Sequence, residues 1–413
     1  MTGRRARART RRFAQAVTSG SRVPGAWAVV GVSVVALAAG TFSIVAIGAL
    51  APVLKADLGL SRPELGFLTS LVFIGSTISS RRGGKLTDSF GAARVLGLAL
   101  VAFAVAMAGA AVAPTAVVFM FAVLAAGFAY GGINPPTNVV VAGTLVRRLG
   151  FFLSLKQSGV PLGGLLAGVV LPPVAVAFGW RWAFGLAVAV CFAAAATTPL
   201  LRNAAVLRPP AGRAAFPGPP RRHLVPVDIF GFVMSGTQWT FLTYLTLYLT
   251  GERGFSLQRA GLALALAQGL GAVGRLLWGH LSDAPGRRVP ILLTMASLAL
   301  ASLALLASDP GSAAIWPLIA VSGFAIVGWN GAFYAFVAER AGPGQVGRAS
   351  GEALSFVFGG AVAVPPLLGL LADATGSWQS LWAASATGVA LAAGALWAGL
   401  RVVAPVVDAP TPT

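Results

Sequence analysis

The amino-acid sequence predicts an all-α membrane protein with twelve transmembrane helices in two pseudo-symmetric bundles of six. Three observations predict this fold class. The chain is apolar along most of its length, its apolar residues fall into twelve blocks, and its second half repeats the pattern of its first half.

The composition indicates that most of the chain lies in lipid. Of the 413 residues, 57% are hydrophobic and only 10% are charged, whereas about a quarter of the residues of a soluble protein are charged. Each apolar block is about 20 residues long, enough for a helix to cross roughly 30 Å of hydrocarbon. Such runs predict helices, because a lipid-embedded backbone must satisfy its own hydrogen bonds. The blocks cover residues 28–50, 65–82, 93–113, 116–142, 151–177, 180–200, 227–249, 260–280, 289–308, 314–338, 351–372 and 380–403.

The formal net charge of +19 follows the predicted loops, so we exclude nucleic acid as a partner. If the N-terminus is cytoplasmic, the cytoplasmic segments hold most of the 30 basic residues. The outer loops hold Lys55, Arg62, Arg181, Arg253 and Arg259. This bias predicts a multi-pass protein with both termini in the cytoplasm. An excess of Arg over Lys and many Ala residues suggest a bacterial inner membrane. The arginine-rich N-terminus is expected to touch anionic lipid headgroups.

The two halves of the chain match each other at an offset of 195 or 196 residues. Polar residues that align between the halves are stronger evidence for the repeat than the abundant glycines. Asp88 aligns with Asp283, and Asn134 aligns with Asn330. Parallel repeats of this kind support alternating access to a site near the midplane. The predicted division is a cytoplasmic arm (1–27), an N-terminal six-helix bundle (28–201), a cytoplasmic linker (202–226), a C-terminal six-helix bundle (227–403) and a cytoplasmic tail (404–413).

The repeated loops carry a recognisable pattern. Gly84-Lys-Leu-Thr-Asp88-Ser-Phe-Gly91 and Gly279-His-Leu-Ser-Asp283-Ala-Pro-Gly286 resemble the signature loop of the major facilitator superfamily. The resemblance covers essentially the whole chain through topology and duplication. It implies a secondary transporter that functions as a monomer, moves a small-molecule substrate by alternating access and can use a coupling ion such as a proton.

The signature loops are predicted to work as conformational latches. Gly84 and Gly279 are expected to let spans 2 and 8 approach their neighbours closely, and Gly91 and Gly286 to permit the turn into the next span. A loop carboxylate against a helix N-terminus or an arginine would exist in only one conformation. The alternative is a loop whose charges only set topology. The latch residues are Gly84, Asp88, Gly91, Arg94, Gly279, Asp283, Gly286, Arg287 and Arg288.

Span 5 narrows the resemblance further. Its sequence Lys156-Gln-Ser-Gly-Val-Pro-Leu-Gly-Gly164 is similar to that of a group of bacterial permeases, many of which are associated with small organic or inorganic anions. Together with the two cations described next, this favours an anionic substrate.

Three charged residues lie within spans, where burial of charge is costly. Lys156 is expected near the cytoplasmic start of span 5, where the positive end of the helix dipole disfavours a cation. Its counterpart in the repeat, Glu352, lies at the start of span 11, where the same dipole end favours an anion. Arg275 lies in span 8, which packs beside span 5 in the superfamily. These charges form our gate or anion candidates, with Lys156 binding substrate, pairing with Glu352, or snorkelling to the headgroups.

In the superfamily fold, spans 1, 4, 7 and 10 line the cavity. Pro135 and Pro136 are expected to break span 4 there, because they remove backbone donors. The symmetric Asn134 and Asn330 pair is the leading candidate for a cavity contact. The full set of cavity candidates is Thr41, Tyr130, Asn134, Asn138, Thr237, Gln238, Tyr244, Asn330 and Tyr334.

The sequence contains no signal for an enzyme, a cofactor or a metal site. Cys191 stands alone, and the phosphate-binding loop of ATPases is missing around Gly84 and Lys85. The central parts of spans 1, 4, 7 and 10 carry no acidic residue, although proton-coupled drug exporters usually have one. We therefore expect a permease for a small, anionic solute. The alternatives are a proton-driven exporter of a hydrophobic drug or natural product, and a membrane sensor without transport.

Overall fold

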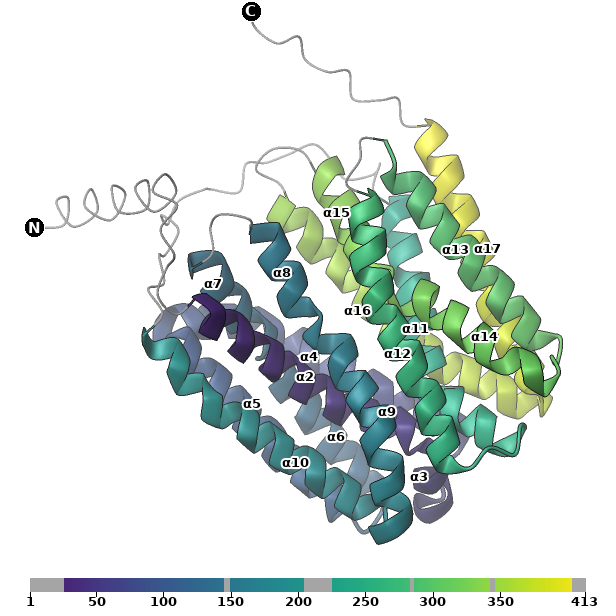
Figure 1. Cartoon of the computed structure of the whole chain (residues 1–413), viewed down its shortest axis with the longest axis horizontal. Coiled ribbons are helices and arrows are strands. Elements are labelled where there is room, and N and C mark those ends of the chain that lie inside the picture. Colours follow the sequence, from purple (N-terminus) through teal and green to yellow (C-terminus); the bar gives the residue numbers. More distant parts are fainter. Residues whose placement is uncertain (1–25, 145–148, 204–224, 283–285, 342–345, 403–413) are drawn as a thin grey trace, which may run out of the picture.

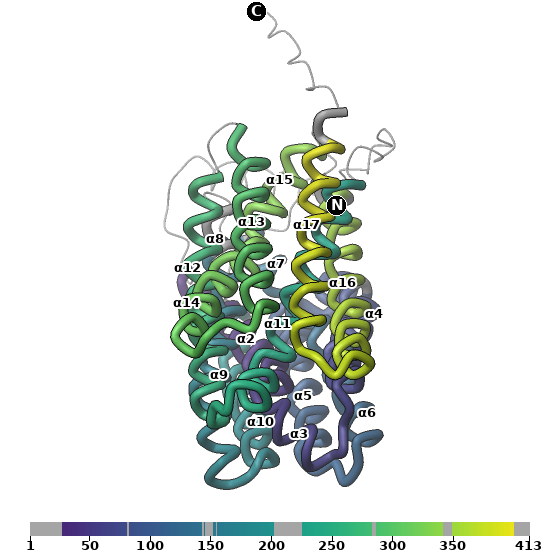
Figure 2. Tube along the Cα trace, turned by 90° about the vertical axis from the view of Figure 1, so that its right-hand side faces the viewer, coloured from purple at the N-terminus to yellow at the C-terminus, as the bar shows by residue number. Residues whose placement is uncertain are grey.

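The computed structural model of the chain describes residues 26–144, 149–203, 225–282, 286–341 and 346–402 (Figure 1). These residues form long helices in two groups that lie side by side (Figures 1 and 2). The first group contains α2 (Ala26–Ala49), α3 (Ala51–Leu58), α4 (Arg62–Phe90), α5 (Ala92–Ala111), α6 (Ala116–Tyr130), α7 (Asn134–Thr144), α8 (Leu149–Gln157), α9 (Gly159–Phe178), α10 (Trp180–Thr197) and the 3-10 turn η1 (Thr198–Asn203). The second contains α11 (Val225–Gly251), α12 (Leu257–Ser282), α13 (Arg288–Ala307), α14 (Ser312–Ser322), the π-helical turn η3 (Gly323–Val327), α15 (Asn330–Arg340), α16 (Val346–Thr375) and α17 (Trp378–Val402).

Ten helical segments in the described ranges are long and apolar enough to cross a membrane. Two predicted blocks, 65–82 and 227–249, fall outside that set although α4 and α11 have 29 and 27 residues. Both helices carry more polar side chains because they face protein instead of lipid. In α11 nearly every residue from Met234 to Leu249 is buried, and α4 packs against α16.

Glycines let the first helix of each group approach the fifth span closely. A Cβ on Gly163 of α9 would lie 2.1 Å from the backbone oxygen of Ala38 in α2. In the other group, a Cβ on Gly360 of α16 would lie 1.9 Å from the backbone oxygen of Phe232 in α11. The glycine pairs that repeat in sequence therefore support the same helix contact in both groups.

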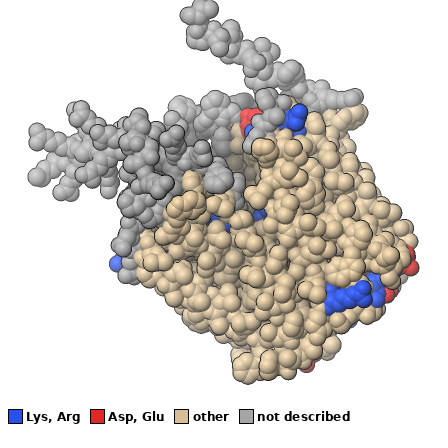
Figure 3. All heavy atoms as spheres, viewed as in Figure 1, with Lys and Arg blue, Asp and Glu red and all other residues tan. Residues whose placement is uncertain are grey.

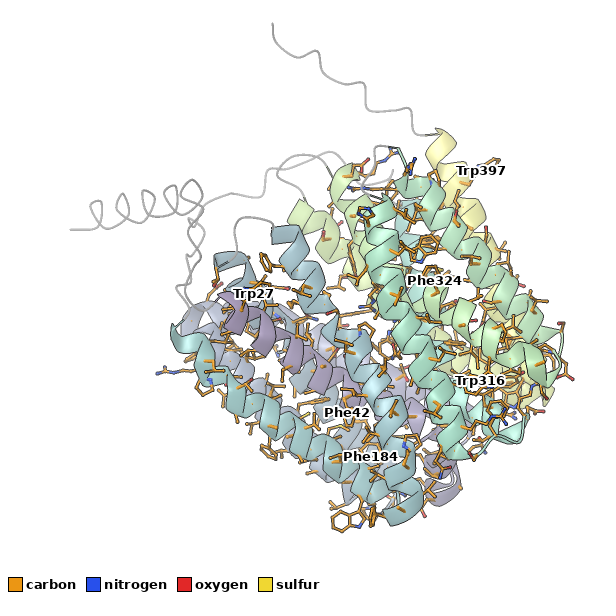
Figure 4. The ribbon with its side chains drawn as sticks, viewed as in Figure 1. Trp27, Phe42, Phe184, Trp316, Phe324 and Trp397 are labelled. Atoms are coloured by element: carbon orange, nitrogen blue, oxygen red, sulfur yellow. The ribbon has the colours of Figure 1, made fainter. Side chains whose placement is uncertain are left out.

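We call the two ends of the molecule the linker end and the far end. At the linker end α2 begins, η1 ends, α11 begins and α17 ends, whereas the far end carries the turns 112–115, 252–256 and 376–377. Trp27 and Trp397 lie near the linker end, and Trp316 lies toward the far end (Figure 4). Aromatic rings at two levels are typical of the two interfaces of a membrane.

The far end is where the two groups hold together. Arg62 at the start of α4 forms an ion pair with Asp373 near the end of α16, with 3.1 Å between Nη1 and Oδ1. The Tyr244 hydroxyl of α11 is 2.7 Å from the Arg62 carbonyl oxygen, and the hydroxyls of Thr69 and Thr243 are 2.8 Å apart. Toward the linker end, Figure 3 shows a recess between the groups with Lys or Arg atoms inside it.

Charges at the far end are balanced by pairs. Arg181 lies 2.9 Å from Asp57 and Arg253 pairs with Asp309, as Arg62 does with Asp373. Three of the four arginines expected in the outer loops thus have nearby acids, whereas Arg259 lies against the rings of Phe255 and Trp316. Most Lys and Arg of the predicted loops belong to the segments at the other end, which agrees with the positive-inside rule if the far end faces out.

Candidate functional site

The site begins with two broken helices. Span 4 is interrupted at residues 131–133, between α6 and α7, as the two prolines predicted. Span 10 is interrupted by the π-helical turn η3 and the turn at 328–329, between α14 and α15. Asn134 and Asn330 are the first residues of the second half-helix in each case. Both half-helices run toward the linker end, so their positive N-terminal ends lie inside the molecule.

Lys156 is fully buried beside the break in span 4. Its Nζ donates to Asn134 Oδ1 at 3.1 Å, to Thr137 Oγ1 at 3.2 Å, and to Asn138 Oδ1. Three neutral oxygens thus satisfy the three donors of an ammonium group. No carboxylate of the described residues lies within ion-pair distance of this ammonium.

Two of our expectations about Lys156 were wrong. The side chain does not snorkel to the headgroups, because it is buried and held by α7. Nor does it pair with Glu352, because its hydrogen-bond partners are all neutral oxygens. α8 and α9 are separated at Ser158, but this residue keeps right-handed helical angles (φ −65°, ψ −20°) and span 5 continues through it. The position of Lys156 against the helix dipole therefore stays a prediction.

Arg275 projects from α12 toward the break in span 10. Its Nε donates to the Val327 carbonyl oxygen at 3.2 Å, and η3 ends at this residue. The guanidinium also lies within electrostatic range of Tyr130 and Tyr334, one from each group of helices. Arg275 therefore lies where the two groups meet, and α12 packs beside α9 as expected for spans 8 and 5.

The π-helical turn is seated closely against α12. A Cβ on Gly274 would lie 2.5 Å from the Phe324 carbonyl oxygen, and the Trp278 indole donates to the same oxygen at 3.1 Å. The ring of Phe324 lies against α12 (Figure 4), 4.8 Å from the ring of Trp278. Because π-helical turns are frequent at functional sites, the π-helical turn beside Arg275 supports a functional role for this arginine.

The second asparagine of the symmetric pair has a different partner. Asn330 Nδ2 donates to Gln238 Oε1 at 3.2 Å, and the Trp329 indole donates to the same oxygen at 2.8 Å. Gln238 belongs to α11, so this cluster ties spans 7 and 10 together. Each asparagine thus links its half-helix to a neighbouring span of its own group.

Comparison with known proteins agrees with this geometry. The sequence pattern of the Major Facilitator Superfamily matches residues 32–354. The chain belongs to the major facilitator superfamily. It is 29% identical over 371 residues to an uncharacterized MFS-type transporter of Mycobacterium tuberculosis, which covers 86% of this chain and 81% of that protein.

Other proteins similar to this chain are named for their substrates. The chain is 24% identical to the hexuronate transporter of Bacillus subtilis, with 89% and 92% of the two chains covered. It is 28% identical to the gentisate transporter of Corynebacterium glutamicum, with 80% and 78% covered. Its fold matches a bacterial homologue of the human lysosomal transporter Spinster, in an inward-facing and occupied conformation, with a TM-score of 0.79, 15% identity and coverage of 93% and 98%.

The signature loops of the superfamily are partly as predicted. Gly91 and Gly286 have positive φ of 85° and 73°, which glycine adopts readily, so their role in the turn is confirmed. The role given to Gly84 and Gly279 was wrong, because a Cβ on either would meet nothing within 4 Å. Close helix approach is provided instead by Gly75, whose Cβ would lie 2.6 Å from the backbone of Phe128.

The basic residues of these loops lie at the linker end. Arg288 forms an ion pair with Glu339 at 2.9 Å and donates to the Ala335 carbonyl oxygen of α15. Arg94 is exposed at the start of α5, and Arg287 precedes α13. Asp283 lies outside the described residues. The structure thus ties one latch loop to the half-helix that follows the break in span 10.

The remaining cavity candidates divide into two places. Thr41 is buried next to Tyr130, Thr237 is buried in α11, and Asn138 is exposed beside Lys156. Tyr244 lies elsewhere, because its hydroxyl is held at the far-end contact by Arg62 and Pro365. It closes the far end and does not line the recess.

Sequence analysis missed three contributors to the site. Thr137 lies one turn after Asn134 and next to Asn138, so its spacing was a signal that could have included it. Trp329 directly precedes Asn330 and could have been found in the same way. The Val327 carbonyl oxygen could not, since no proline marks the π-helical turn.

Proposed function

We propose that this superfamily member transports a small organic anion by alternating access, with Lys156 and Arg275 as its cationic contacts. The observation that carries the proposal is the buried Lys156 ammonium, which donates to neutral oxygens only. Among the described residues, no carboxylate contacts it. A charge buried in this way is retained where a ligand or a function needs it, because burial without a counter-charge is costly.

Arg275 supports the same substrate class from the other group of helices. Its guanidinium lies near a carbonyl oxygen and two tyrosines, and among the described residues it has no acidic partner. The N-terminal ends of α7 and α15 add two positive dipole ends to the same region. Four features that attract an anion thus come from spans 4, 5, 8 and 10.

Similarity to named transporters agrees with this inference. Hexuronate and gentisate are carboxylates, and proteins named for their transport align with most of this chain. We infer that the substrate carries at least one carboxylate and that the protein works as a monomer in a bacterial inner membrane.

Uptake into proteoliposomes tests the proposed function. Proteoliposomes that contain the purified protein should take up at least one member of a panel of sugar acids, aromatic acids and small dicarboxylates. Liposomes without the protein should not. Repeating the uptake with and without an imposed pH gradient shows whether protons are coupled. Transport of neutral hydrophobic drugs with no uptake or competition by any carboxylate would favour the exporter alternative.

Orientation in the membrane gives a direct prediction. We expect the linker end in the cytoplasm and the far end outside, because most Lys and Arg of the predicted loops belong to the linker end. In a Cys191→Ala background, Asp309→Cys should react with an impermeant maleimide in intact cells, and His280→Cys only after the cells are opened. Both side chains are exposed. The opposite labelling pattern would reverse the proposed orientation.

The signature-loop carboxylate gives a second prediction. If Asp88 latches one conformation, Asp88→Asn should lower transport about tenfold through a shift of roughly 1–3 kcal/mol between states. Amount and membrane insertion of the protein should be unchanged. Lys85→Gln, three residues away on the same exposed segment, serves as the control for a loss of loop charge. Wild-type turnover in Asp88→Asn would leave the loop with a topological role alone.

A further inference from the structure

A second potential binding site lies on the outer surface of the first group of helices, away from the recess. The end of α5 and the start of α10, which lie side by side (Figure 1), form a groove of about 550 Å³. Its volume is in the range of small-molecule sites, roughly 300–1,000 Å³. The groove is lined by Ala108, Ala111, Val112, Arg181, Trp182, Gly185 and Val188.

The groove lies where a lipid would reach it. Val112 and Trp182 are 76% and 69% exposed, and Val105, about two turns before Val112 in α5, is 60% exposed. Such an apolar surface on a membrane-spanning group faces acyl chains. The exposed Trp182 marks the far-end interface, where aromatic residues are enriched. An acyl chain in the groove would therefore have its headgroup beside Arg181.

Arg181 is positioned to bind a phosphate and has donors to spare. Its guanidinium donates from Nη1 to Asp57 Oδ2 at 2.9 Å and from Nη2 to the Ala113 carbonyl oxygen at 3.3 Å. The group has five N–H donors, and the side chain is 47% exposed. The guanidinium also lies 4.3 Å from the centre of the Trp180 ring, which fixes its orientation.

Asp57 places an acceptor next to that cation. Its Oδ2 accepts from the Trp180 indole at 2.7 Å and from Arg181, whereas neither bond uses Oδ1. The Trp180 hydrogen bond and then the Arg181 guanidinium lower the pKa of the Asp57 carboxyl, so it is charged at neutral pH. The side chain is 48% exposed. A cation and an anion, each with free bonding capacity, thus stand side by side at the mouth of an apolar groove.

We propose that this groove binds phosphatidylethanolamine, with the lipid phosphate on Arg181, the primary ammonium on Asp57 Oδ1 and one acyl chain along α5 and α10. The adjacent opposite charges complement a zwitterionic headgroup better than a purely anionic one, because Asp57 repels a second negative charge. A primary ammonium can also donate hydrogen bonds to the carboxylate, which a trimethylammonium cannot do.

Native mass spectrometry of the purified full-length protein tests this proposal. The delipidated protein is titrated with phosphatidylethanolamine, phosphatidylcholine and phosphatidylglycerol that carry identical acyl chains. The first bound lipid should show a preference of about tenfold for phosphatidylethanolamine, as one charge-assisted hydrogen bond allows. Asp57→Asn should remove this preference, and Arg181→Gln should weaken the binding of all three lipids.

Matched variants separate the groove from general lipid adhesion. Asp309→Asn removes another exposed far-end aspartate that pairs with an arginine, and it should keep the preference. Gly185→Leu fills the groove without touching either charge, and a Cβ there meets nothing within 4 Å, so folding should survive. It should lower phosphatidylethanolamine binding. Equal binding of phosphatidylethanolamine and phosphatidylcholine, or an unchanged preference in both Asp57→Asn and Gly185→Leu, would overturn the proposal.

Discussion

Lys156→Gln is expected to abolish most carboxylate transport. Glutamine has a similar length and a polar end that can donate to two of the three oxygens around it, so the packing of α7 against α8 should survive. What disappears is the charge. Loss of one desolvated charge from an ion-pair contact costs about 3 kcal/mol, which corresponds to a roughly hundredfold loss of affinity. Uptake of the best carboxylate into proteoliposomes, with substrate binding measured in detergent, checks both effects.

Three further variants define the role of the charge. Lys156→Arg keeps the charge and should restore part of the transport. Lys55→Gln, a far-end lysine of α3 that lies away from the recess, should transport normally. Because Glu352 is the counterpart of Lys156 in the sequence repeat, the double variant Lys156→Gln with Glu352→Gln is also informative. Rescue of transport by the double variant would show that the two residues pair in another state of the transport cycle, and our assignment of Lys156 as an anion contact would then be wrong.

Gly48→Val is expected to stop the far end from closing. A Cβ on Gly48 of α2 would lie 2.2 Å from the Leu242 carbonyl oxygen of α11, across the contact between the two groups. Each group can fold with the larger side chain, but the closed contact cannot form without a shift of backbone. Overpacking of this kind costs about 1–3 kcal/mol, so the far-end-closed state should become roughly tenfold or more rarer. We expect transport to fall by at least about tenfold.

Accessibility of a buried position reports the same change. Thr243 is 2% exposed in the closed contact, so Thr243→Cys in a Cys191→Ala background should resist an impermeant maleimide. Adding Gly48→Val should make it reactive. The matched control is Gly31→Val in the same helix, where a Cβ meets nothing within 4 Å. Normal transport and an unreactive Thr243→Cys in Gly48→Val would show that the far end closes by a different contact.

The general architecture could be predicted because it follows from local sequence. Apolar blocks predict spans, the offset of the repeat predicts two similar groups, and Pro135 and Pro136 predict the break in span 4. The π-helical turn in span 10 could not be predicted, since Gly323 and Gly328 permit several backbone paths and only their contact with α12 selects one.

The site was predicted less completely, for a similar reason. Sequence analysis singled out Lys156, Asn134 and Asn138 separately, but their contact depends on how α7 packs against α8. Tyr244 was misplaced because its spacing in α11 gives a face of the helix and not a depth in the membrane.

The two cations of the recess are anchored in different groups of helices. Lys156 is fixed by α7 in the first group, and Arg275 by η3 in the second. During alternating access the groups move relative to each other while each keeps its internal contacts. A solute that binds both cations therefore links the two groups of helices, and a solute that reaches a single cation is bound to one group alone. The span of a solute between its negatively charged atoms, more than its affinity, would then decide whether it is a cargo or an inhibitor.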